Sequence, residues 1–226
     1  MPCTAKKFEI GRPDESASGY ADVDYSITTK ELARMIRKAG LDFAALPDEK
    51  FDHPLGESTG AGVIFGATGG VMEAALRTAV ETLTGKELPK LEFEEVRGTK
   101  GIKEASYKVG ELEVSVCVAS GLANAKKVME AVKNGEKNYT FIEIMACPGG
   151  CVNGGGQPTQ PSEVYNFNDL RALRAQALYK NDAAKAIRKS HENPEIQKLY
   201  AEYFEKPGSH KAHAALHTTY VKRDRF

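Results

Sequence analysis

The sequence predicts an α/β fold whose C-terminal third is mainly helical. Apolar strand patterns alternate with helix patterns between residues 63 and 145, and only helix patterns follow after residue 168. With 226 residues, the chain is long enough to bury a substantial core, in one large domain or in two small lobes.

The N-terminal quarter contains one predicted helix between irregular segments. Residues 1–24 are loop-like, because glycine and proline interrupt a polar stretch. A helix begins at Thr28, which forms a capping-box pattern with Glu31, and Gly40 ends it. Its apolar stripe consists of Leu32, Met35, Ile36 and Ala39. Residues 41–62 are predicted to be irregular.

A strand, a glycine turn and a helix are predicted next. The strand covers residues 63–65, and the helix runs from about Gly70 to Leu83. The N–H groups at the start of such a helix can receive an anion.

Among the remaining predicted elements, strands and a helix alternate up to residue 145, and only helices follow from residue 168. Strands are expected at 102–109, 111–118 and 138–145, with Gly110 at the first turn and a helix at 122–132. Helices are expected at 168–179 and 183–191, followed by one that Asn193 caps. The basic tail, residues 206–226, is predicted to be extended.

Charge and hydropathy narrow the class of partner. Lys+Arg and Asp+Glu both number 31, so no net field attracts nucleic acid or an anionic membrane surface. We find no apolar run of membrane-spanning length and no secretory signal at the start, which leads us to expect a cytoplasmic, reducing setting. In that setting, four cysteines indicate metal binding or catalysis more often than disulfides.

The most informative segment is EIMACPGGCVNGGGQP, residues 143–158. Cys147 and Cys151 lie in a loop that proline and glycine keep out of regular helix. Thiolates favour iron–sulfur clusters, zinc or copper(I). The glycines at 149, 150 and 154–156 leave room for a bulky group and leave amide N–H groups to face an anionic cluster. The motif predicts a metal or cluster site without choosing among them.

The two other cysteines are less informative by themselves. Cys3 is isolated at the N-terminus. Cys117 alternates with valines in a predicted strand, which favours a small buried hydrophobic residue. A zinc site that uses all four cysteines remains an alternative, although Cys117 lacks the paired spacing of zinc knuckles.

Together, MPCTAKKFE (1–9) and the loop at 143–158 resemble the second and third signature loops of the iron-only (di-iron) hydrogenases. FGATGGVMEAALRTA (65–79) and the segment 189–220 resemble further stretches of the same domain, nearest to the clostridial ferredoxin-linked enzymes. The resemblance implies the mixed strand–helix units of the large catalytic domain, with residues 1–226 as its C-terminal part. It also implies reversible conversion of two protons and two electrons to H₂, with ferredoxin as the electron carrier.

The resemblance further implies a six-iron H-cluster and the residues that hold it. This cofactor is a 4Fe–4S cubane joined through a cysteine sulfur to a di-iron centre with CO, cyanide and dithiolate ligands. By motif position, Cys3 and Cys147 are cubane ligands, Cys151 bridges to the di-iron centre, and Lys6 donates to a cyanide. The remaining residues of the implied pocket are Met1, Met145, Phe65, Gly66, Pro2 and Glu9. Glu9 either pairs with a nearby cation or is an exposed charge.

One part of the family pattern does not occur in this sequence. The first signature loop, TSCCPxW-like, supplies the fourth cubane ligand and a proton-transferring cysteine. We therefore expect the chain to be inactive alone and to need a complementary N-terminal hydrogenase segment or subunit.

Two other classes remain open. The first is a non-catalytic iron–sulfur binding or assembly protein of the same superfamily, although such relatives tend to lose the set Lys6, Met1 and Met145. The second is a zinc-binding structural domain. The four histidines of the C-terminal part are expected at the surface or in packing, since no local acid or cysteine accompanies them: His191, His210, His213 and His217.

Overall fold

The computed structural model describes residues 2–16 and 18–222, and the predicted pocket residue Met1 lies outside them. A mixed sheet of three strands forms its centre: β1 (Ile102–Val109), β2 (Leu112–Ser120) and β3 (Phe141–Met145). β1 pairs antiparallel with β2 across a tight turn, and β3 pairs parallel with β2. The parallel pair is joined through α5 (Leu122–Lys133), as parallel strands require. The predicted α/β class is confirmed.

The two faces of β2 pack against different helices. Val116 and Val118 join Met72 and Leu76 of α4 (Gly70–Thr84) in one buried cluster. The intervening side chains, including Cys117, join residues of α5 in a second cluster. Because side chains alternate along a strand, both faces of β2 are covered and the strand is buried throughout its second half.

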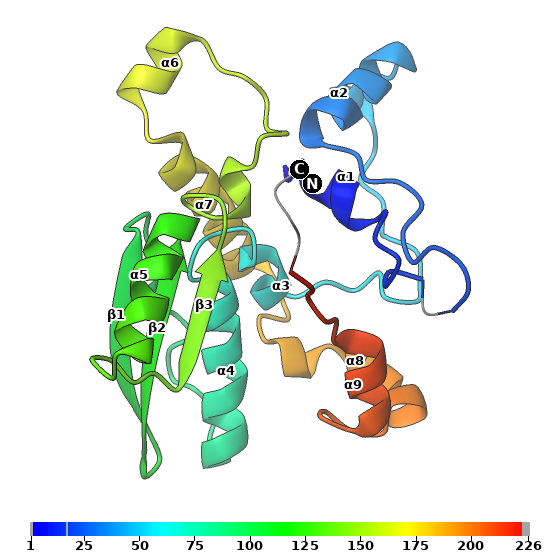
Figure 1. The fold of residues 1–226 in the computed structure, drawn as a ribbon. Helices are drawn as coiled ribbons and strands as arrows, with labels where there is room; N and C mark the ends of the chain where they lie inside the picture. Colours follow the sequence, from blue (N-terminus) through cyan, green and yellow to red (C-terminus); the bar gives the residue numbers. More distant parts are fainter. Residues whose placement is uncertain (1, 17, 223–226) are drawn as a thin grey trace.

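The segment before α3 (Gly60–Ile64) has almost no core of its own. It contains the short α1 (Lys6–Glu9), α2 (Thr29–Lys38) and the 3-10 turn η1 (Phe43–Ala45). The predicted capping box of α2 is present: Thr28 Oγ1 accepts from Glu31 N, and Glu31 accepts from Thr28 N. Within the described residues 2–58, Thr28 is the one buried residue. Figure 1 shows α1 and α2 standing apart from the sheet.

The C-terminal part is helical, as predicted. It consists of α6 (Ser162–Phe167), α7 (Leu170–Ala184), α8 (Pro194–Leu199), a π-helical turn (Tyr200–Phe204) and α9 (His210–Leu216). Three further 3-10 turns lie at Glu94–Val96, Cys151–Asn153 and Ser190–Glu192. Asn193 caps α8 through its side chain, with Pro194 at the first helical position. No helix in the described part of the chain is long and apolar enough to cross a membrane.

Several predicted elements were wrong. Residues 63–65 belong to α3 and its end, not to a strand, because Thr59 caps the segment by accepting from Gly62 N. A short apolar run does not distinguish the two by periodicity. The helix predicted over 183–191 does not form. Instead, α7 continues to Ala184, and residues 185–189 are not helical. α9 lies in the tail that was expected to be extended, and it is capped by Ser209 Oγ, which accepts from Ala212 N. α1 and α6 were not predicted.

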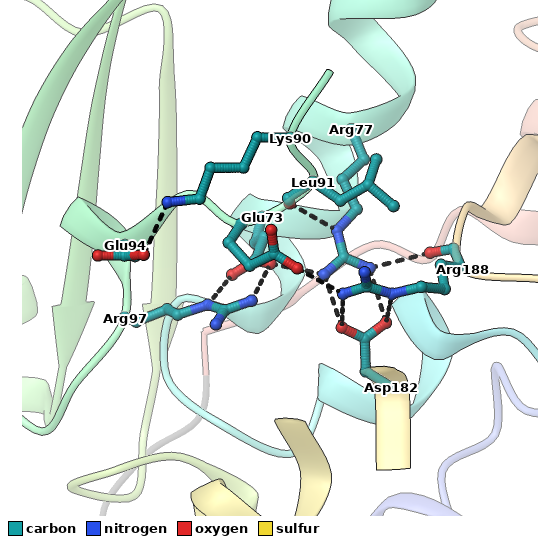
Figure 2. Close-up of polar contacts among 9 residues, drawn as sticks. Glu73, Arg77, Lys90, Leu91, Glu94, Arg97, Asp182 and Arg188 are labelled. Carbon is teal, nitrogen blue, oxygen red and sulfur yellow. Dashed lines mark hydrogen bonds and ion pairs between the residues drawn. The ribbon is translucent and has the colours of Figure 1, made fainter. Parts of the chain in front are cut away.

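A buried ion network explains why residues 185–189 leave the helix. Arg188 and Arg77 both donate to Asp182, and Arg77 also pairs with Glu73 (Figure 2). Arg97, ahead of β1, donates to Glu73 with two nitrogens. Burial alone would disfavour ionisation of Asp182, but the bonds from both arginines outweigh it and lower its pKa. The network fixes α7 to α4.

Candidate metal-cluster site

The cysteine loop follows β3 directly, and Ser120 at the end of β2 holds its shape. Ser120 Oγ donates to the carbonyl of Cys147 over 3.3 Å and accepts from Gly149 N over 2.8 Å. Gly150 N closes the turn onto the same Cys147 carbonyl at 2.9 Å. Gly149 and Gly150 both have φ near +90°, a conformation that glycine adopts without strain. The sequence therefore forms a tight turn in which Pro148 is the one residue with a side chain between the two thiols.

A second segment, the glycine turn at residues 66–70, packs directly on this loop. Thr68 N donates to Gly149 O at 3.1 Å, and Val152 N donates to Gly66 O at 2.9 Å. A Cβ on Gly150 would lie 2.6 Å from Thr68 N and 2.7 Å from Gly66 O. The loop and the turn are thus two backbone surfaces in contact, and Gly66 lies against Val152, the neighbour of Cys151.

The glycines at 154–156 bring the N-terminal segment to the same place. Gly156 N donates to the carbonyl of Pro2 at 2.6 Å. A Cβ on Gly154 would lie 2.4 Å from that carbonyl oxygen and 3.0 Å from Cys3 N. We expected these glycines to give clearance to a cofactor. The contacts give another reason for Gly150, Gly154 and Gly156, because each faces the chain's own backbone or side chains at very short range.

Electrostatic coupling shows that three thiols and one cation converge. Burial raises the pKa of the Cys151 thiol, and the neighbouring charges of Cys3 and Cys147 raise it further. Lys6 acts in the opposite direction. The pKa of Lys6 is itself raised, first by its bond to Glu9 and, less, by Cys3 and Cys151. The fold therefore brings together Cys3, Cys147, Cys151 and Lys6, which lie far apart in the sequence.

The spacing of the three sulfurs does not suit a single ion. Thiolates around one zinc at about 2.3 Å place their sulfurs roughly 3.8 Å apart. Among the described residues, the one group whose three ligand atoms all lie within 4.8 Å is Glu81, His191 and Glu192, not the cysteines. Three thiols at wider spacing, beside the Lys6 cation, fit a bulkier anionic cluster.

The remaining residues considered for the site differ in their burial and in their contacts. Glu9 forms an ion pair with Lys6, and both side chains are partly exposed, at 36% and 43%. Phe65 is 45% exposed, and Met145 is half-buried at the end of β3. Cys117 is completely buried among Ala119, Ala125 and Val128, so it is a core residue, as favoured, and takes no part in a four-cysteine site.

His191 forms hydrogen bonds within the protein that account for its position. His191 lies between Thr78 Oγ1 and Glu81 Oε2, each at 3.1 Å. In the group that it forms with Glu81 and Glu192, the ammonium of Lys189 already lies 2.9 Å from both carboxylates. A lysine therefore supplies the positive charge there.

Glu143 and Ser120 are site residues that the sequence did not reveal. Glu143 is buried and accepts from Gly69 N and Met72 N at the start of α4. The sequence did indicate that this helix N-terminus could receive an anion, and the anion is this internal carboxylate. Nothing local to Glu143 or Ser120 marked either residue, because their partners lie 27 to 74 residues away.

This fold and thiol set define a class of iron–sulfur protein, and comparison with known proteins gives the family. Residues 1–155 match the family model "Iron only hydrogenase large subunit, C-terminal domain". Residues 168–223 match the model "Iron hydrogenase small subunit". The chain belongs to the iron-only hydrogenase family.

Individual relatives agree with this. The chain is 53% identical over its whole length to an NADP-reducing hydrogenase subunit, HndD, of Solidesulfovibrio fructosivorans, and covers 38% of that protein. It is 49% identical to iron hydrogenase 1 of Clostridium pasteurianum over 98% of this chain and 39% of that one. A solved FeFe-hydrogenase HydA1 from Chlamydomonas reinhardtii matches 98% of this chain and 62% of its own, with 40% identity and a TM-score of 0.74.

The same comparison includes a more distant branch. Protein NAR1 of Arabidopsis thaliana is 30% identical over 97% of this chain and 48% of its own. The chain spans about two-fifths of the length of the two hydrogenase relatives.

Proposed function

We propose that the chain is the C-terminal part of a hydrogenase catalytic domain, residues 1–226, that helps to hold an H-cluster. When bound, that cofactor supplies the reversible conversion of two protons and two electrons to H₂. The observation that carries the proposal is the convergence of Cys3, Cys147 and Lys6 on Cys151. The higher identity to hydrogenases than to Protein NAR1 favours an enzyme over a non-catalytic iron–sulfur protein.

Each residue of the site has a proposed task. Cys3 and Cys147 would hold the cubane, and Cys151 would be the ligand shared with the di-iron centre. Lys6 would give a charge-assisted hydrogen bond to a cyanide ligand, and Glu9, with which Lys6 forms an ion pair in the structure, would set the position of Lys6. The proposed packing residues around the di-iron centre are Met1, Pro2, Met145, Phe65 and Gly66.

A complementary N-terminal hydrogenase segment is the proposed partner. A cubane needs four ligands, and the site gathers three thiols. The solved relative contains a further share of chain beyond the part that this chain matches. The described segment before α3 also exposes several large apolar side chains against which such a segment can pack: Tyr20, Tyr25, Leu32, Met35, Phe43 and Phe51.

The electron carrier and the compartment are further parts of the proposal. A ferredoxin-type carrier follows from the resemblance to the clostridial enzymes, whereas HndD is named as NADP-reducing. A cytoplasmic setting agrees with the four free thiols in the described structure, which a reducing compartment maintains.

The test is anaerobic production of the chain with and without a hydrogenase segment that carries the first signature loop, followed by maturation. We expect the assembled pair to hold iron and sulfide, to show cubane EPR signals and CO and cyanide infrared bands, and to evolve H₂. Cys3→Ala, Cys147→Ala and Cys151→Ala should each reduce the iron content, whereas Cys117→Ala, the matched control in the core, should retain it.

The other outcomes separate the alternatives. Iron–sulfur signals without cyanide bands or H₂ would support a non-catalytic iron–sulfur protein. A colourless protein with stoichiometric zinc would exclude both. Strong H₂ evolution by the chain alone would remove the need for the partner.

A further inference from the structure

Glu143 is a buried carboxylate that connects the strand before the cysteine loop to the glycine turn. It lies in β3, two residues before Met145, and is 5% exposed. Its Oε1 accepts from Gly69 N at 2.6 Å and its Oε2 from Met72 N at 2.7 Å. The first N–H groups of a helix have no partner within the helix, so a carboxylate there satisfies them and complements the helix dipole.

Lys103 holds the same turn from the other side. This residue of β1 is 5% exposed, and its Nζ donates to Thr68 O and Gly98 O, each at 2.9 Å. Burial raises the pKa of Glu143 and lowers that of Lys103 to about 8, and the attraction between the two charges opposes both shifts. One residue thus binds N–H groups of the turn region, and the other binds a carbonyl.

The turn then transfers its position to the cysteine loop. Thr68, whose carbonyl Lys103 binds, donates its own N–H to Gly149 O. Gly66 accepts from Val152 N, next to Cys151. The contact between turn and loop leaves no space for a Cβ on Gly150. A displacement of the turn must therefore displace the backbone between Cys147 and Cys151.

We propose that Glu143, with Lys103 as its counter-charge, is a positioning residue that sets where the Cys147 and Cys151 thiols lie. The contacts carry this inference by themselves, and only its last step, from thiol placement to cluster binding, rests on the proposed function.

The test measures the reactivity of each thiol in the iron-free full chain. Glu143→Gln keeps the shape of the side chain, but its amide NH₂ faces an N–H donor, and the counter-charge of Lys103 is lost. We expect Cys147 and Cys151 to react several-fold faster with iodoacetamide, site by site in mass spectrometry. Cys117, in the core on the other face of β2, should keep its wild-type rate and so reports on global unfolding.

The matched control is Glu73→Gln. Glu73 is also a buried glutamate that binds α4 to other elements, but its partners are Arg77 and Arg97 rather than the turn. It should leave the rates of Cys147 and Cys151 near wild type in the folded chain. If Glu143→Gln yields too little folded protein, Lys103→Met tests the same connection from β1 and should give the same pattern.

Two results would overturn the positioning role. One is unchanged reactivity of Cys147 and Cys151 in both variants at the turn. The other is equal acceleration of Cys117, which would show a loss of stability alone. Iron content and cubane EPR g-values after assembly form a separate readout. A wild-type chain that binds no cluster even together with the complementary segment would refute the proposed function, while the alkylation result would still decide the role of Glu143.

Discussion

Arg77 of α4 and Asp182 of α7 form a double hydrogen bond, with Nη1 on Oδ1 and Nη2 on Oδ2, both at 2.8 Å and both side chains fully buried. The other three N–H groups of Arg77 donate to Leu91 O, Arg188 O and Glu73 (Figure 2). All five guanidinium donors are therefore used. Arg77 lies in the part that matches the large-subunit family and Asp182 in the part that matches the small-subunit family, so this pair joins the two.

The first prediction concerns this pair. Asp182→Asn should lower the free energy of unfolding by about 3–5 kcal/mol, because removal of one partner leaves buried arginine charge without its counter-charge. Arg77→Lys should also lower the free energy of unfolding, since an ammonium offers three donors in place of five. Urea unfolding followed by circular dichroism measures both. Lys90→Met, which breaks an exposed ion pair with Glu94, serves as control and should change little. Wild-type stability in Arg77→Lys would contradict this account.

The second prediction uses two neighbouring glycines. Gly154→Ala should separate the N-terminal segment from the cysteine loop, because its Cβ would lie 2.4 Å from the Pro2 carbonyl oxygen. Gly155→Ala meets only Thr4 side-chain atoms at 3.5 and 3.6 Å, an ordinary contact. We expect faster alkylation of Cys3 and lower iron content in assembled protein for Gly154→Ala, and wild-type values for Gly155→Ala. Equal behaviour of the two variants would refute the docking role of Gly154.

The third prediction concerns Ser120. Ser120→Ala should leave the buried Gly149 N without its acceptor, at a cost of about 1–3 kcal/mol in unfolding free energy. It should also loosen the Cys147 turn, which alkylation of Cys147 can detect. Ser115→Ala, on the same strand, keeps the backbone N–H that donates to Thr140 Oγ1 and is the control. An unchanged Cys147 rate with lowered stability would limit Ser120 to a structural role.

Local signals in the sequence predicted some elements closely. Strand 102–109, the α2 capping box and the Asn193 cap depend on neighbouring residues, and each is confirmed. The predicted elements were wrong where contacts between residues distant in sequence determine the backbone conformation. Residues 185–189 have helical composition, but Arg188 and Lys189 extend to reach Asp182 and Glu81. The capping hydroxyl of Thr59 makes a helix of the run that was expected to be a strand.

The same distinction between local motifs and long-range contacts applies to the residues of the site. The thiols were found from their motif, and their convergence with Lys6 agrees with the resemblance. The residues that hold the backbone around them were missed, because Glu143, Ser120 and Lys103 each act on segments distant in sequence. Buried polar residues of this kind look like interruptions of a strand pattern until their partners are known.

The last prediction is a pH dependence from Lys103. Burial lowers its pKa from 10.5 to about 8 in the folded chain. Between these values the unfolded chain holds a proton that the folded chain has released, so the Lys103 contribution to stability increases as pH rises through this range. The free energy of unfolding of the wild type minus that of Lys103→Met should therefore increase from pH 8 upward. Burial raises the pKa of Cys151, which has the opposite effect above neutral pH, but it is present in both proteins and cancels in the difference. Urea unfolding of both proteins at several pH values below and above 8 measures the difference. A flat or falling difference would show that the Lys103 ammonium is not destabilised by burial beside the glycine turn.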